Sequence, residues 1–256
     1  MSKLEHIDEN ETFSAMMARL KAKHLPEDKR SNQEIMAELD EVGRQEAIKQ
    51  QERYAIERVE WQKQQAVKRA SASGIPTEYQ SAELNAYCEY QREISERMTK
   101  FVANFELALS TGANAILHGD IGTGKTHFAC AVANELLKRG FSVQYTTLYR
   151  ACAYIKEAWK SQEPDDTETK RIEHFIKSDL LIVDEIRVHR DFDMPIITEL
   201  FDGRYRERKP TIVITNFNPQ QLAECLTLPI YDRLTRKPSA MIELVGDSLR
   251  GDIDVF

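Results

Sequence analysis

The chain has 256 residues, of which 41% are hydrophobic and 30% charged, and its formal net charge is −7. This composition is that of a globular protein with room for one large domain plus an appendage, or for two small domains. No apolar run approaches the ~20 residues of a membrane-spanning helix, and the N-terminus lacks the apolar core of a signal peptide. We therefore expect a cytoplasmic protein with no membrane partner. The negative charge disfavours adhesion of the whole surface to nucleic acid and leaves that role to a local basic face.

Residues 1–70 predict helices that cannot bury a core of their own. Residues 1–30 predict a short helix that ends near Pro26, and its apolar stripe fits either its own domain or the groove of a partner. Residues 31–34 fit the S-x-x-E capping box of a second helix. The whole stretch holds 13 Lys and Arg against 14 Asp and Glu, a net charge of −1. This predicts a solvent-exposed helix or short coiled coil, and Tyr54 and Trp61 favour one that a partner covers.

A break at residues 71–76, with the sequence Ser-Ala-Ser-Gly-Ile-Pro, predicts a domain boundary. Residues 81–109 then resume apolar spacing and predict one helix that leads into a short buried strand at residues 114–118.

The stretch from residue 119 to residue 126 fits G-x-x-x-x-G-K-[ST], the phosphate-binding loop of P-loop proteins. Its glycines let backbone N–H groups turn inward around a polyphosphate. Lys125 is expected to reach the β- and γ-phosphates of ATP, and the Thr126 hydroxyl is expected to ligate Mg²⁺. Helical spacing after the loop places it at a helix N-terminus, which favours an anion. The expected cofactor-binding residues are Gly119, Asp120, Ile121, Gly122, Thr123, Gly124, Lys125 and Thr126.

Strands and helices alternate through the rest of the chain. Further strands are predicted at residues 142–147, 180–184, 211–215 and 240–245. Helices are predicted at residues 148–160, 168–177 and 194–207. Asn218-Pro219 fits the N-cap and first position of the next helix, and residues 222–234 predict one or two short helices. This alternation predicts an α/β fold with a parallel five-stranded sheet between helices, preceded by an all-helical N-terminal region.

Two carboxylates follow the apolar strand at residues 180–183. Function in parallel sheets gathers at the carboxyl ends of the strands, beside the phosphate loop. Asp184 is therefore expected to bind Mg²⁺ or its water, and Glu185 to orient and deprotonate the attacking water.

Two further polar residues are candidates for the same reaction. Asn216 ends the next strand, where it can polarise the water or touch the γ-phosphate; the alternative is ordinary turn chemistry. Arg233 lies past the fourth strand, on the face away from its own phosphate loop. It either completes the site of a neighbouring copy in trans or forms a local ion pair, and the pattern favours neither.

Together these segments resemble one family. The similar segments are the phosphate loop with His127, residues 180–186, Ile214-Thr215-Asn216, Tyr231-Asp232-Arg233-Leu234 and the linker Ser73-Gly74-Ile75-Pro76. They look like AAA+ ATPases of the DnaC type, the bacterial and phage loaders of the DnaB-type replicative helicase. The resemblance runs from about residue 71 to the end, and the N-terminal region matches in layout only.

The resemblance implies an ATP·Mg²⁺-dependent switch in DNA replication, with several copies assembled so that Arg233 completes a neighbour's site. It adds His127 to the cofactor-binding residues. It divides the chain into a helicase-docking region at 1–70, a linker and leading helix at 71–110, and an ATPase domain at 111–256. The DnaB-type hexamer and single-stranded DNA are the implied partners. The helix after the second strand carries the residue types that single-strand binding uses, namely Tyr149, Arg150, Tyr154, Lys156 and Trp159.

The chain also departs from the family. Arg187 stands where the family usually has glycine, and no Cys-rich zinc module precedes the ATPase domain, unlike in DnaI-type loaders. Because the sequence ends at Phe256, we expect an ATPase domain without the C-terminal helical lid of most AAA+ proteins, and Arg250 is a candidate for a residual second sensor. Two alternatives stay open: an IstB-like ATPase that assists a transposase on double-stranded DNA, and a nucleotide-gated adaptor with little catalysis.

Overall fold

The computed structural model of the chain describes residues 32–85, 89–186 and 193–246. By its internal contacts the chain divides into two units, Met1–Trp61 and Gln62–Phe256. The helix predicted within residues 1–30, the Ser31 end of the capping box, Arg187 and Arg250 lie outside the described residues. Of the helices in the described ranges, none is long and apolar enough to cross a membrane.

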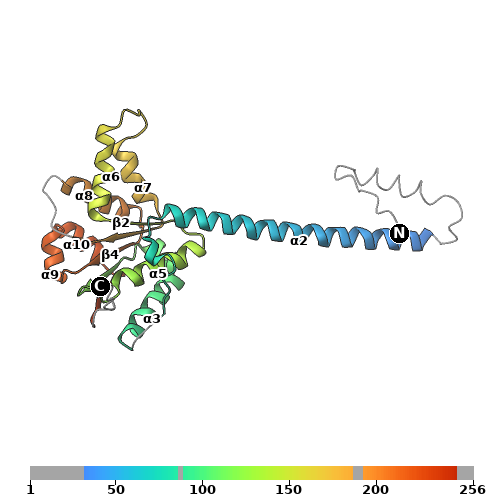
Figure 1. Ribbon diagram of the computed structural model, residues 1–256, viewed down its shortest axis with the longest axis horizontal. Helices are drawn as coiled ribbons and strands as arrows, with labels where there is room; N and C mark the ends of the chain where they lie inside the picture. Colours follow the sequence, from blue (N-terminus) through green and yellow to red (C-terminus); the bar gives the residue numbers. More distant parts are fainter. Residues whose placement is uncertain (1–31, 86–88, 187–192, 247–256) are drawn as a thin grey trace, which may run out of the picture. The chain divides into compact units, whose positions relative to one another are not determined.

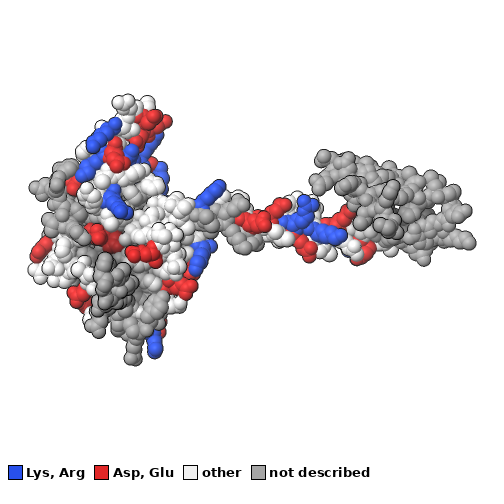
Figure 2. All heavy atoms as spheres, in the orientation of Figure 1, with Lys and Arg blue, Asp and Glu red and all other residues white. Residues whose placement is uncertain are grey.

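Helix α2 (Asn32–Ala72) buries none of the side chains described between residues 44 and 61. Ile48, Tyr54 and Trp61 are among the exposed ones. Figure 2 shows Lys and Arg interspersed with Asp and Glu along this helix. The prediction of a mixed-charge, solvent-exposed helix is confirmed, and the helix continues through Gly43, where the apolar pattern thins.

The second unit is built on a five-stranded sheet in which every pairing is parallel, in the order β2-β3-β4-β1-β5 (Figure 1). The strands are β1 (Ala115–Gly119), β2 (Val143–Thr147), β3 (Leu180–Asp184), β4 (Thr211–Thr215) and β5 (Ala240–Leu244). The α/β prediction with five parallel strands is confirmed, because each continuous apolar run became a strand covered on both faces.

Helices cover both faces of this sheet, as Figure 1 shows. They are α3 (Glu89–Ala103), α4 (Phe105–Thr111), α5 (Lys125–Lys138), α6 (Leu148–Glu157), α7 (Glu168–Lys177), α8 (Met194–Arg206), α9 (Pro219–Cys225) and α10 (Leu228–Thr235), with single turns η1 (Thr77–Tyr79) and η2 (Ala158–Lys160). Successive strand residues serve opposite faces. Leu117 and Ile182 pack with α3, α4 and α5 in one core, whereas Ile116 and Val183 pack with α6 to α10 in the other.

The prediction of one continuous helix over residues 81–109 was wrong. Residues 81–85 lie outside any helix, and α3 and α4 are separate helices. The carbonyl oxygen of Ala82 accepts a hydrogen bond from Asn134 of α5, and that of Glu83 lies 3.0 Å from the His127 ring, so these groups are engaged outside a helix. At the second break both the backbone N–H of Asn104, at 3.0 Å, and its side chain, at 2.8 Å, donate to the Lys100 carbonyl oxygen.

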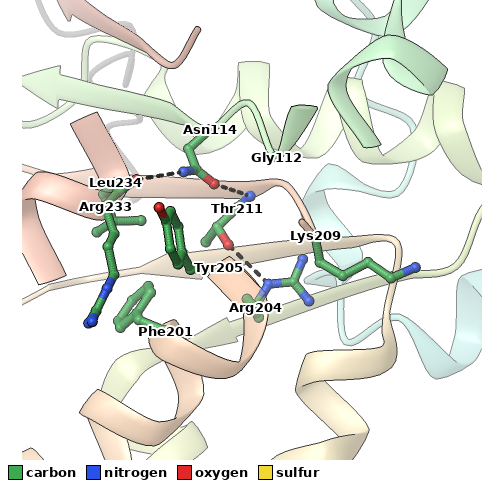
Figure 3. A pocket seen from close by; sticks show the side chains of 9 residues that line it. All are labelled: Gly112, Asn114, Phe201, Arg204, Tyr205, Lys209, Thr211, Arg233 and Leu234. Atoms are coloured by element: carbon green, nitrogen blue, oxygen red, sulfur yellow. Dashed lines mark hydrogen bonds between the residues drawn. The ribbon is translucent and has the colours of Figure 1, made fainter. Parts of the chain in front are cut away.

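A buried arginine holds the amino ends of β3 and β4. Arg204 of α8 is 1% exposed, and it donates to the carbonyl oxygens of Phe175, Ser178 and Pro210 and, at 3.0 Å, to Thr211 Oγ1 (Figure 3). Burial lowers the pKa of Arg204 to about 9, which leaves it charged at neutral pH. One side chain thus joins the end of α7 to the starts of two strands.

Replacing Arg204 with Met is expected to destabilise the second unit by about 3 kcal/mol or more, because the buried carbonyl oxygens lose their donors. Urea denaturation of the full chain measures this. Arg206→Met is the matched control, since Arg206 only forms an exposed pair with Glu199 and should change stability by less than about 1 kcal/mol. Equal losses in the two variants would contradict this role of Arg204.

Candidate nucleotide-binding site

The predicted phosphate loop and the predicted acidic residues lie at the same edge of the sheet. β1 ends at Gly119 and β3 ends at Asp184, and β4, which ends at Thr215, pairs with both. Because all three strands are parallel, their carboxyl ends meet at one edge. The structure therefore brings together the loop, the pair Asp184–Glu185, and Asn216, which follows Thr215.

The loop has the conformation that its glycines allow. Gly119, Gly122 and Gly124 have φ of +136°, +88° and +90°, in the region that L side chains avoid. A Cβ on Gly119 would also lie 2.1 Å from the carbonyl oxygen of Leu244 on β5. The first glycine of the motif is thus required by the neighbouring strand, whatever the loop binds.

Lys125 begins α5 and lies against the loop. Its side chain is buried, and Nζ donates to the carbonyl oxygens of Gly119, at 2.8 Å, and Asp120. An ammonium group at a helix N-terminus, within a loop of inward-turned backbone, is a favourable place for a phosphate. The predicted role of Lys125 fits this position.

Asp184 is a buried carboxylate that accepts three hydrogen bonds at this edge. It is 7% exposed. Its Oδ2 accepts hydrogen bonds from Thr126 Oγ1 at 2.9 Å and from the Tyr145 hydroxyl at 2.8 Å, and its Oδ1 accepts from the Glu185 backbone N–H at 2.6 Å. These bonds satisfy a carboxylate that would otherwise be costly to bury.

Thr126 and Asp184 offer a donor set that suits Mg²⁺. Both supply oxygen, the ligand atom that Mg²⁺ prefers, and Thr126 Oγ1 lies 2.9 Å from Asp184 Oδ2, so the two oxygens could hold one ion together. In the described part of the chain, no three His, Cys, Asp or Glu side chains gather to hold a metal on their own. A metal here would therefore need oxygen ligands from a bound nucleotide as well.

Sequence reasoning missed Tyr145, which it treated only as a strand residue. The signal lies in the register of β2 against β3, in which Tyr145 pairs with Ile182 and Thr147 with Asp184. Alternation puts Tyr145 and Asp184 on the same face. Burial and the charge of Asp184 raise the pKa of Tyr145 above its ordinary value, so its hydroxyl remains a donor.

Glu185 and Asn216 are exposed at this edge. Glu185 has φ of +53°, a strained value for a residue with a side chain and one that recurs at functional sites. Asn216 lies in a turn in which Thr215 Oγ1 accepts from the Phe217 N–H at 3.0 Å. Their catalytic roles stay predictions.

His127 faces the segment that precedes α3. Its Nε2 lies 3.0 Å from the Glu83 carbonyl oxygen, and Asn134, two turns further along α5, donates to the carbonyl oxygens of Tyr79 and Ala82 at 3.0 Å. One face of α5 therefore holds residues 79–83 beside the phosphate loop. The part of His127 in nucleotide binding stays a prediction.

Arg233 lies at the opposite edge. Its carbonyl oxygen accepts a hydrogen bond from Asn114, directly before β1, at 3.3 Å. Its guanidinium forms an ion pair with Asp202 and lies 5.6 Å from the centre of the Tyr205 ring. Figure 3 shows Arg233 with Phe201 and Tyr205 among the side chains that line one pocket. In a single chain Arg233 is thus in a local ion pair, on the side away from its own phosphate loop.

The aromatic and basic residues of α6 divide into two groups. Tyr149 is 78% exposed and Arg150 is exposed beside it, whereas Tyr154 packs on Phe175 with ring centres 5.7 Å apart. Lys156 forms an ion pair with Asp193, and Trp159, in the turn η2 that follows α6, donates to Glu168. Tyr154 and Trp159 are 40% and 57% exposed but contact neighbouring side chains, whereas the first turn of α6 presents an exposed aromatic ring beside an exposed arginine.

A phosphate loop after β1, an acidic end on β3 and a strand between these two in a five-stranded parallel sheet define an AAA+ protein. The family model described as IstB-like ATP binding protein matches residues 19–253. The chain thus belongs to the family of IstB-like ATP-binding proteins.

Relatives and solved structures agree with this assignment. The replicative helicase loader DnaC of Escherichia coli K12 is 28% identical over 214 residues, which cover 75% of this chain and 85% of DnaC. A crystal structure of DnaI is 26% identical, with a TM-score of 0.55 over 69% of this chain and 95% of the chain in that structure. A crystal structure of the DnaC helicase loader, at 21% identity, shares the fold with a TM-score of 0.58 over 66% of this chain and 100% of that one.

Proposed function

We propose that this protein is an ATP-dependent loader of a DnaB-type replicative helicase onto single-stranded DNA. The observation that carries the proposal is the similarity to the helicase loader DnaC over 85% of its length. The carboxyl edge of the sheet supplies the switch: ATP binds there, and slow hydrolysis times the release of the helicase.

The phosphate loop and Asp184 would hold the nucleotide. Lys125 binds the β- and γ-phosphates, while Thr126 and Asp184 hold Mg²⁺, which when bound neutralises charge on those phosphates. Glu185 orients the attacking water and accepts its proton, and Asn216 contacts the water or the γ-phosphate. The strained backbone of Glu185 supports its role, because strain at an exposed strand end is retained where function needs it.

Helix α2 would provide contacts with the helicase. Tyr54 and Trp61 are 62% and 59% exposed and are seven residues apart, so they share a face of the helix. Two large aromatic side chains on one exposed face are typical anchors of a protein interface. Residues 1–70 are accordingly the proposed docking region, with 71–110 as linker and 111–256 as the ATPase domain.

The first turn of α6 would contact single-stranded DNA. Tyr149 offers a stacking surface and Arg150 a phosphate contact, the two elements that single-strand binding combines. They directly follow Thr147, which caps α6 and pairs in register with Asp184. This proximity to the nucleotide edge supports DNA contacts that respond to ATP.

Self-assembly would bring Arg233 to the ATP of a neighbouring copy. Its place at the amino edge of the sheet supports action in trans, since its own phosphate loop lies at the carboxyl edge. To act there it must leave Asp202 and place its charge on the transferring phosphate.

The family match supports one second candidate, an IstB-like ATPase that assists a transposase on double-stranded DNA. The net charge of −7 disfavours filaments on duplex DNA. A third candidate function is that of a nucleotide-gated adaptor with little catalysis. A Glu185→Gln variant that retains full biological activity would favour the adaptor over the ATPase.

The proposed partner is tested by native mass spectrometry of the full chain mixed with the replicative helicase of its host and ATP. We expect a discrete complex of a helicase hexamer with several copies of this protein. The double variant Tyr54→Ser, Trp61→Ser should lose it, whereas Ile48→Ser, exposed on another face of α2, should keep it. Assembly on DNA without any helicase complex would contradict the loader and favour the transposition helper.

Replacing Arg233 with Ala should leave ATP binding unchanged and lower hydrolysis in the assembled state at least about 100-fold, because the transition state loses a cation. Steady-state ATPase assays with helicase present measure this, with Arg236→Ala on the same helix end as control. Mixing the Arg233→Ala and Lys125→Ala chains should restore activity, since each supplies what the other lacks. Full activity of Arg233→Ala alone would exclude the trans role.

A further inference from the structure

Tyr145 touches the candidate metal site with its side chain. Its hydroxyl donates to Asp184 Oδ2 at 2.8 Å, and this oxygen also accepts from Thr126 at 2.9 Å. The Tyr145 ring is packed against the core beneath α5. The carboxylate is therefore oriented from two sides, by α5 and by β2.

The backbone of the same residue holds the segment in which α2 ends. The Tyr145 N–H donates to the Ser73 carbonyl oxygen at 2.6 Å. Gly74 has φ of +74°, and a Cβ on it would lie 2.5 Å from the Tyr145 carbonyl oxygen. Gln144, the residue before Tyr145 on β2, donates from Nε2 to the Ala72 carbonyl oxygen at 3.2 Å. The chain at residues 72–74 thus lies directly on the outer edge of β2.

The junction after α2 is also held by a hydrogen bond within α2 and by packing against the core. Ser73 is fully buried, and its Oγ donates to the Ala70 carbonyl oxygen at 2.6 Å in the last turn of α2. Ile75, two residues on, is part of the core that α5 covers. A displacement of β2 at Tyr145 therefore cannot leave the end of α2 unaffected.

We infer that Tyr145 is a positioning residue for Asp184 and that it couples the nucleotide site to the junction at residues 72–75. The inference rests on the proposed binding of Mg²⁺·ATP at Thr126 and Asp184. A tyrosine side chain has two rotatable bonds, and here both its hydroxyl and its backbone are hydrogen-bonded. A shift of the Asp184 carboxylate is thereby passed to the strand edge rather than absorbed, through a contiguous chain of hydrogen bonds of the kind that can carry coupling between sites.

Tyr145→Phe in the full chain removes only the hydroxyl. We expect the gain in ATP affinity on adding Mg²⁺, measured by calorimetry against the same titration in EDTA, to fall about five- to tenfold, with affinity in EDTA unchanged. Hydrogen exchange of residues 62–76 should respond to Mg²⁺·ATP in the wild type and no longer in the variant. Tyr231→Phe on α10, a half-buried tyrosine in the other core, is the matched control and should behave as the wild type.

Gly74→Ala tests the coupling from the other end, because its Cβ meets the Tyr145 carbonyl oxygen. It should keep Mg²⁺-dependent ATP binding and lose the exchange response. A Tyr145→Phe chain that matches the wild type in both measurements overturns the inference, and one that loses Mg²⁺ dependence but keeps the exchange response overturns the coupling. A wild-type chain without Mg²⁺-dependent ATP binding overturns the proposed function as well, and this outcome is distinct from the other two.

Discussion

The buried carboxylate of Asp184 is the constraint on which the site depends. An acidic group at the end of a fully apolar strand is costly unless donors surround it. The donors come from three places: Thr126 at the start of α5, Tyr145 on β2, and the backbone of Glu185. The order of the parallel strands places each of these donors near the Asp184 carboxylate. The donors in turn offset the cost of burying that carboxylate in the sheet.

Much of the sheet was predictable because buried parallel strands have a simple signature. The apolar runs at residues 180–184 and 211–215 became β3 and β4 without a change of bounds, and Asn218 caps α9 as expected from its place before Pro219. The prediction of one helix over residues 81–109 was wrong because the spacing of apolar residues cannot show that Asn134 and His127 of α5 engage the carbonyl groups of that segment. Tertiary contacts decided its conformation.

The candidate site likewise contains residues that could be identified from the sequence and one that could not. The motif around Lys125 and the acidic strand end at Asp184 are local patterns, so both could be named from the sequence. Tyr145 could not, because its role depends on the register between β2 and β3. For Arg233 the sequence left the ion pair and the trans role open. The structure shows the ion pair with Asp202, and the trans role stays a proposal.

The proposed binding of ATP at the carboxyl edge of the sheet, through Lys125, underlies the other roles proposed for this site. It is measured by isothermal titration of ATP with Mg²⁺ into the wild type and into Lys125→Ala, with Lys138→Ala, an exposed lysine of the same helix, as control. We expect Lys125→Ala to weaken binding at least about tenfold, since a charged hydrogen-bond donor is lost, and the control to bind as the wild type does. Tight ATP binding by Lys125→Ala would rule out this role of the lysine.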